Sequence, residues 1–166
     1  MASPESLVIL SDMFQQNTFV AYTSGSPDCL VFDPGLQPED IIQAMETEHL
    51  VPSMILITHG HADHIGGVAA LKQRWPECPL AVGRGDAEKL VNPELNLSAG
   101  YGIPITSPPA DRCLDHGEII DAAGFSLEVL DTPGHSPGHV SFLFREVDPP
   151  MVIAGDVLFQ GSVGRV

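Results

Sequence analysis

The alternation of apolar and polar positions divides the chain into short strands separated by turns and a few helices. Apolar runs rich in β-branched and aromatic residues predict strands at residues 7–10, 18–22 and 29–32. The turn-rich segment 23–28 makes the last two strands hairpin-like. A helix is expected to begin at Pro38, because two acidic residues and then apolar residues at helical spacing follow it, and to end before Pro52.

The same pattern continues through the rest of the chain. A buried strand is expected at 51–58 and a helix at 66–75, which Pro76 stops. Further strands are expected at 80–82, 125–130, 140–144 and 151–154, and a short helix at 86–91. The Pro-, Gly- and Ser-rich stretch 92–110 reads as a loop that borders a pocket and is the natural place for substrate contacts. With no repeat or linker, residues 1–166 are expected to form a single domain.

Composition and charge argue against nucleic-acid and membrane partners and against disulfide bonds. The chain has 22 acidic and 7 basic residues, a formal charge of -15, which opposes the phosphate-led binding that nucleic-acid proteins use. Neither a secretory signal nor an apolar run of membrane-spanning length is visible, so we expect a cytoplasmic protein with no membrane partner. Cys29, Cys78 and Cys113 are odd in number and lack CxxC spacing, which favours reduced thiols.

The strongest chemical signal is a cluster of four potential metal ligands, directly after the predicted strand that ends at Thr58. His59 and His61 are two residues apart, so an extended backbone points both rings to one side, where they can bind one ion. Asp63 and His64 are displaced as the chain turns into its helix, which suits a second ion about 3.5 to 4 Å from the first. The cluster therefore predicts a binuclear centre.

Two later polar motifs supply the remaining candidate ligands. The rigid turn 131–139 lies between two predicted strands, and its His135 is the expected third ligand of the first ion. His139, in the same turn, is assigned a supporting or structural role and is left out of the metal shell. Asp156 follows the strand at 151–154, and its two carboxylate oxygens can bridge two cations.

These motifs carry a resemblance to a known family. The matching segments are THGHADH at 58–64, TPGHSPGH at 132–139 and GDVLF at 155–159. Together they resemble the metallo-β-lactamase superfamily, and GSVGR at 161–165 with DPG at 33–35 is similar to its glyoxalase II-like bacterial hydrolases. The resemblance implies an α/β fold, the four-layer αββα sandwich, and a hydroxyacylglutathione hydrolase-type thioesterase. It also implies one or two Zn²⁺ ions, with iron or manganese as alternatives, and a supporting role for Asp33 behind the site.

The sequence departs from the family pattern in one respect. The family supplies a further histidine to the second metal from a late strand, and no histidine follows His139 here. The family's last strands and closing helix should also follow the GR motif, so the sequence resembles a C-terminally incomplete domain. Weak binding of the second metal and poor activity are expected for this chain alone. An inactive metal-binding remnant is therefore one alternative to an enzyme.

The expected reaction is hydrolysis of a small-molecule thioester such as an acyl-glutathione. Metal ions would lower the pKa of a bridging water toward about 7, and the metal-bound hydroxide would attack the carbonyl carbon. Asp63 is the expected catalytic residue, which orients this nucleophile and accepts its proton. The acyl group, the thiol carrier and the oligomeric state stay open.

Other branches of the family fit the sequence less well. A persulfide dioxygenase with a single iron is the alternative enzyme. A true β-lactamase is disfavoured by the lack of an export signal, by His64 directly after Asp63, and by Asp156 where a thiolate is expected. The charge of -15 disfavours the RNA-processing branch, and His61 disfavours the flavin-partnered di-iron branch, which carries glutamate there.

Overall fold

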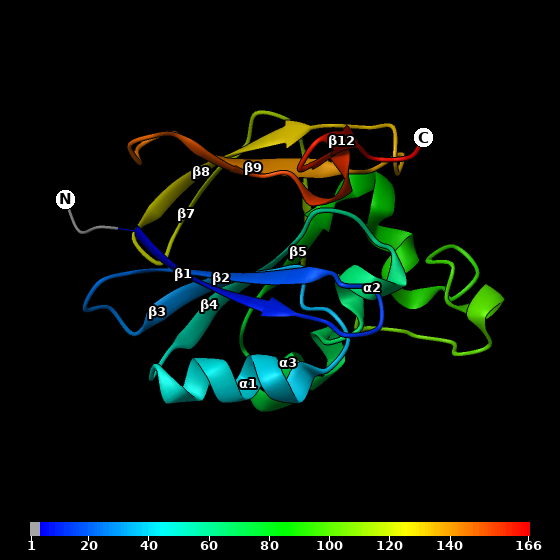
Figure 1. The fold of residues 1–166 in the computed structure, drawn as a ribbon, viewed down its shortest axis with the longest axis horizontal. Helices are drawn as coiled ribbons and strands as arrows, with labels where there is room; N and C mark the ends of the chain where they lie inside the picture. The colour runs from blue at the N-terminus through cyan, green and yellow to red at the C-terminus, as the bar shows by residue number, and fades with distance from the viewer. Residues whose placement is uncertain (1–3) are drawn as a thin grey trace.

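Two β-sheets face each other in the computed structural model, which describes residues 4–166 (Figure 1). The first sheet has the order β1-β2-β3-β4-β5-β6, and its strands are Pro4–Leu10, Asn17–Thr23, Asp28–Phe32, Val51–Ile57, Leu80–Gly83 and Arg112–Leu114. Strands β1 to β3 pair antiparallel, and β3 to β6 pair parallel. The second sheet is antiparallel with the order β10-β9-β8-β7, and its strands are Met151–Ile153, Val140–Phe144, Phe125–Asp131 and Ile119–Ala122.

Short helices make the remaining connections. The α-helices are α1 (Pro38–Thr47), α2 (Ala62–Ile65) and α3 (Val68–Arg74). The 3₁₀ helices are η1 (Arg84–Val91), η2 (Ala99–Tyr101) and η3 (Gly155–Val157), and a small hairpin joins β11 (Leu158–Phe159) to β12 (Ser162–Val163). No helix within residues 4–166 is both long enough and apolar enough to span a membrane.

Period-two alternation in the central strands sends side chains into two separate cores. Val31 and Ile55 point to the side of the first sheet that α1 and α3 cover, where they pack in one cluster with Met45 of α1. Phe32, which directly follows Val31, points between the sheets, and its ring lies 5.4 Å from the ring of Phe142 in β9. Because both faces of β3 and β4 are covered, residues 29–32 and 54–57 of these strands are continuous apolar runs.

The outer face of the second sheet differs from that of the first. Figure 1 shows α1 and α3 below the first sheet and no helix above the second sheet, over the part of the chain that the structure describes. Ile119 and Val152 in the second sheet are 52% and 44% exposed. The described residues therefore form three layers, one of helices and two of strands.

The expected strands up to 80–82 and from 125 onward are present, as is the β2–β3 hairpin, and α1 ends before Pro52. The helix expected at 66–75 is present as α3, which begins at Val68 and ends at Arg74. The short helix α2 was not predicted, and Gly66 and Gly67 separate it from α3. A Cβ on Gly67 would lie 2.6 Å from the carbonyl oxygen of Gly35, so this close approach excludes a side chain there. Strands β6 and β7 were not predicted.

Candidate metal centre

The predicted ligand residues come together at one end of the sandwich, although they lie far apart in the chain. His59 and His61 lie in the loop after β4, and Asp63 and His64 lie in α2. His135 lies in the β8–β9 loop, and Asp156 lies in η3. Two groups of three donors converge within 4.8 Å, and His59 belongs to both. The first group also holds His61 and His135, and the second holds His64 and Asp156.

Three imidazole nitrogens meet in the first group. The His61 Nδ1 atom lies 3.1 Å from His59 Nε2 and 3.0 Å from His135 Nε2. On the far side of its ring, His135 Nδ1 lies 2.9 Å from the carbonyl oxygen of Arg165. A carbonyl can only accept, so Nδ1 carries the proton and Nε2 presents its lone pair to the group.

The tautomer of His59 follows by the same reasoning. Its Nδ1 lies 3.1 Å from the Thr58 hydroxyl, and that hydroxyl donates its own hydrogen to Asp33 at 2.7 Å. The hydroxyl oxygen therefore accepts from His59, which leaves a second Nε2 lone pair directed at the group. Two lone pairs thus converge on the His61 nitrogen.

A cation fits between these nitrogens. Two nitrogens bound to a tetrahedral ion at about 2.0–2.1 Å would be about 3.3 Å apart, close to the separations of 3.0 and 3.1 Å observed here. Burial lowers the pKa of His59 well below its ordinary value and lowers that of His61 to about 4. Both rings are therefore neutral at pH 7, which is the form that binds metal.

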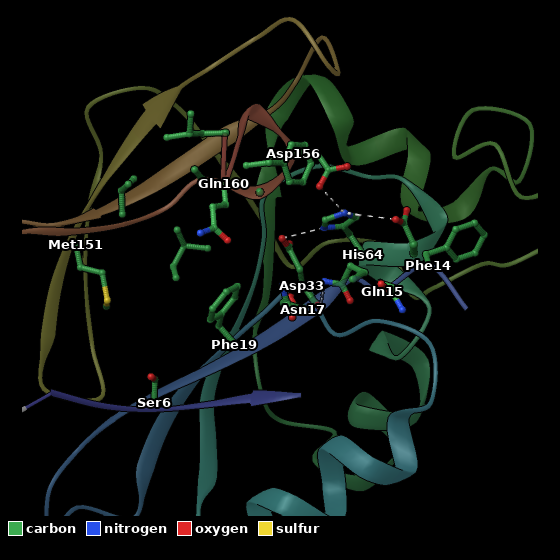
Figure 2. A pocket seen from close by; sticks show the side chains of 18 of the residues that line it. Ser6, Phe14, Gln15, Asn17, Phe19, Asp33, His64, Met151, Asp156 and Gln160 are labelled. Carbon is green, nitrogen blue, oxygen red and sulfur yellow. Dashed lines mark hydrogen bonds and ion pairs between the residues drawn. The ribbon is translucent and has the colours of Figure 1, made fainter. Parts of the chain in front are cut away.

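The second group contains a carboxylate that faces both sets of donors. Asp156 Oδ1 lies 3.2 Å from His64 Nε2 (Figure 2). Asp156 Oδ2 lies 3.5 Å from His135 Nε2. His64 Nδ1 lies 3.0 Å from Asp33, so the opposite nitrogen faces the site. That Nε2 atom is buried, and within the described residues its contact with Asp156 is an ion pair without a hydrogen bond. One oxygen of Asp156 is thus available to each group.

The protonation of His64 depends on the charges around it. Desolvation lowers its pKa, but Asp33, Asp156 and Asp63 together outweigh this effect and raise the pKa to about 10. In the metal-free protein a proton therefore balances part of the negative charge of the three carboxylates. A divalent cation can take over this role, because it also binds the Nε2 atom in its neutral form.

Asp63 and His139 lie at the margin of the two groups. Asp63 Oδ2 is 3.6 Å from His64 Nε2, outside both sets of converging donors, and burial raises the pKa of this carboxyl. His139 stacks on the ring of His59 at 4.9 Å and is bonded through Nδ1 to the Thr132 hydroxyl at 2.9 Å. It belongs to neither group.

Three buried residues, Asp33, Thr58 and Asp86, support the ligands from behind. Asp33, with φ of 48°, accepts the Thr58 amide at 2.7 Å through Oδ1 and the Thr58 hydroxyl through Oδ2. Its contact with His64 makes Asp33 the common anchor of both groups. Sequence reasoning missed the role of Thr58, and it also missed Asp86, a fully buried carboxylate that accepts the Gly60 amide at 2.8 Å. No motif around Asp86 indicated this contact.

A pocket of about 610 Å³ opens beside His64 and Asp156, between the β1–β2 edge and β10 (Figure 2). Much of its wall is apolar and includes Phe19 and Phe159. The loop at 92–110 does not line this pocket. Tyr101 of this loop does approach it, because its ring lies 5.6 Å from the ring of the pocket residue Phe14.

Sequence comparison places this site in a family. The profile of the Metallo-beta-lactamase superfamily matches residues 12–166. The chain belongs to this superfamily. It is 41% identical over 138 residues to the probable metallo-hydrolase YqgX of Bacillus subtilis, and 36% identical over 155 residues to the hydroxyacylglutathione hydrolase GloC of Haemophilus influenzae. These alignments cover 82% and 92% of the chain, but 64% of YqgX and 71% of GloC.

Solved structures confirm the predicted α/β fold, the metallo-β-lactamase sandwich. The BLEG-1 B3 metallo-beta-lactamase superposes with a TM-score of 0.88 at 36% identity, over 98% of this chain and 76% of its own. TTHA1623 in a di-iron-bound form superposes with a TM-score of 0.77 at 34% identity, over 96% of this chain and 76% of its own. A member of this superfamily thus carries a histidine-rich candidate metal site at one end of its sandwich.

Proposed function

We propose that this chain carries the centre of a metal-dependent hydrolase that cleaves thioesters such as acyl-glutathione. The observation that carries the proposal is the convergence of His59, His61 and His135, with Asp156 facing both this group and His64. Relatives named hydroxyacylglutathione hydrolase support the thioester as substrate, GloC at 36% identity among them.

Under this proposal each predicted ligand has a defined place. His59, His61 and His135 would hold one ion, Asp63 and His64 would hold the other, and Asp156 would be a ligand of both. Zn²⁺ is the proposed metal, with iron or manganese as alternatives. When bound, such an ion acidifies water toward a pKa of about 7 and polarises a carbonyl oxygen.

Residues of the protein itself would accept the proton of the attacking water. Asp63 accepts the proton of the attacking water, a role that suits a carboxyl whose pKa is raised by burial. As the acyl carbon is attacked, the C–S bond breaks and the thiolate takes the electron pair. A thiol has a pKa of about 8.5, so this leaving group needs no strong acid.

The formal charge of -15 opposes anions in general, so an anionic thiol carrier would depend on a local basic group. Six of the seven lysines and arginines, all within residues 4–166, pair with carboxylates. Arg165 is the exception, and its backbone carbonyl contacts His135. We propose it as the residue that attracts a carboxylate of glutathione.

The test combines elemental analysis with thioester hydrolysis. His59→Ala and Asp156→Asn should each abolish release of free thiol from S-lactoylglutathione in zinc-supplemented buffer, because each removes a proposed ligand. His49→Asn is the matched control, since His49 is exposed at the end of α1 and its positive φ of 57° suits asparagine. Unchanged turnover in either ligand variant would contradict the proposal. Bound iron, with oxygen uptake when a persulfide is added, would instead indicate a dioxygenase. If the unsubstituted chain turned over neither substrate, it would be an inactive remnant.

A second candidate reaction is β-lactam hydrolysis, which the similarity to BLEG-1 favours. The attack on the carbonyl is the same, but the leaving group is an amide nitrogen that requires a proton. Parallel measurements of kcat/KM on a β-lactam and on an acyl-glutathione decide between them. A larger value for the β-lactam would replace the thioester proposal.

A further inference from the structure

Asp86 is a buried carboxylate that contacts both loops of the candidate metal centre. It lies in η1 just after β5, and its side chain is completely buried. Its Oδ2 accepts the Gly60 amide at 2.8 Å, and its Oδ1 accepts the Gly138 amide at 2.8 Å. The hydroxyl of Ser136 also donates to Oδ2. One side chain therefore joins two segments of the chain, because Gly60 and Gly138 are 78 residues apart.

The positions of these partners matter for the metal centre. Gly60 lies between His59 and His61, and Ser136 directly follows His135. We propose that Asp86 is a positioning residue that holds these two segments in register, so that the three imidazole nitrogens meet at one cation. This inference rests on the proposed function, because it assumes that the three histidines bind a metal.

Lys89 completes the set of partners around Asp86. Its Nζ atom lies 3.2 Å from Asp86 Oδ2 and donates to the hydroxyl of Ser136. A buried carboxylate is costly unless its charge is paired and its lone pairs are used. The two amides, the hydroxyl and the ammonium group meet this requirement, so a single arrangement of the two loops is favoured.

The backbones around Asp86 are packed too tightly for side chains. A Cβ on Gly138 would lie 2.2 Å from the Asp86 nitrogen, and a Cβ on Gly60 would lie 2.5 Å from Lys89 Cβ. A Cβ on Gly85 would lie 2.8 Å from Gly138 Cα. The three glycines thus let η1 touch both loops directly. Small shifts of Asp86 would consequently be passed on to the histidines.

Replacement of Asp86 by asparagine removes one of the two contacts to backbone amides while it keeps the size of the side chain. Asparagine has nearly the same shape, but it offers one acceptor oxygen where Asp86 offers two. In either orientation its NH₂ group would face a backbone N–H, of Gly60 or of Gly138, and one tether is lost. Asp111→Asn is the matched control, because Asp111 also accepts a backbone amide, of Leu80 at 2.8 Å, and binds Lys72 at 2.9 Å, but contacts neither histidine loop.

The experiment measures metal affinity directly. Zn²⁺ is titrated into the metal-free protein against a chelating dye, for the unsubstituted chain, D86N and D111N. We expect D86N to bind Zn²⁺ about 10- to 100-fold more weakly, the range found when residues behind a metal ligand are changed. D111N should bind as the unsubstituted chain does. Equal affinity of D86N and the unsubstituted chain would overturn the positioning role.

A second measurement separates this inference from the proposed function. Hydrogen exchange of the metal-free protein should be faster at the Gly60 or Gly138 amide in D86N, and unchanged there in D111N. If the unsubstituted chain binds no Zn²⁺, iron or manganese, the proposed function fails, whereas the exchange rates still decide whether Asp86 joins the loops. Unchanged exchange at both amides would refute the tether.

Discussion

Replacement of Asp33 by asparagine should disable His64 as a ligand and destabilise the metal-free protein. One Asp33 oxygen accepts the Thr58 amide, and the other accepts the Thr58 hydroxyl and His64 Nδ1. If the amide oxygen of the introduced asparagine stays on the Thr58 amide, its NH₂ group faces His64. The imidazole must then accept through Nδ1 and carry its proton on Nε2, the atom that faces Asp156. The opposite orientation places two donors against each other.

The size of the effect follows from burial. The side chains of Asp33 and His64 are each 4% exposed, so solvent hardly screens their ion pair. Loss of one charge-assisted hydrogen bond costs about 1.5–3 kcal/mol, and loss of a neutral one costs about 1 kcal/mol. The free energy of unfolding at pH 7 should therefore fall by about 3 kcal/mol, or the melting temperature by roughly 6–12 °C. Backbone strain does not contribute, because asparagine tolerates the positive φ of position 33 as well as aspartate does.

Urea unfolding of the metal-free protein measures this change. Asp121→Asn is the control, since Asp121 is an exposed aspartate in β7 and its replacement should stay within about 0.5 kcal/mol. Elemental analysis after incubation with Zn²⁺ should show less bound metal in D33N than in D121N. A loss below about 1 kcal/mol relative to D121N, with metal content unchanged, would refute the assigned role of Asp33.

Two further predictions concern protonation and backbone geometry. In the metal-free protein, burial lowers the pKa of His61 and His139 to about 4, so the unfolded chain binds more protons and stability should fall as the pH drops from about 6.5 toward 4. For His64, neighbouring carboxylates outweigh desolvation and raise the pKa to about 10, so its stabilisation is full below about pH 6.5 and is lost as the pH rises toward 10. Urea unfolding between pH 4 and 10 should thus show a maximum near neutrality, and a steady rise to pH 10 would contradict the assignment. Gly155→Ala should cost about 2 kcal/mol or more, because φ is +50° and a Cβ would lie 2.8 Å from His139 Nε2. Gly161→Ala is the control, because φ is +79° and no atom lies within 4 Å of the added Cβ, and it should cost only about 1 kcal/mol. Equal losses of stability for the two variants in thermal melts would exclude a contact between the Cβ at position 155 and His139.

The sequence alone was sufficient for most elements and for the pairing of the first two candidate ligands. Alternation of apolar residues predicted the long strands, because period-two burial is a local property of an extended chain. The spacing of His59 and His61 placed both rings on one side for the same reason, and their nitrogens lie 3.1 Å apart. Strands β6 and β7 escaped prediction because they have three and four residues and include charged positions.

Residue chemistry had already named His135 and Asp156 as partners of the first cluster, but only the tertiary structure decided how closely these distant groups approach one another. His135 is 74 residues from His61, and the packing of one sheet on the other brings their nitrogens to 3.0 Å. The contribution of Asp86 was beyond sequence reasoning, since it binds the amides of Gly60 and Gly138. Every residue except proline has such an amide, so no pattern of residue types indicates which ones a carboxylate will meet. Residue chemistry named the candidate ligands, whereas the folded backbone determines how they converge.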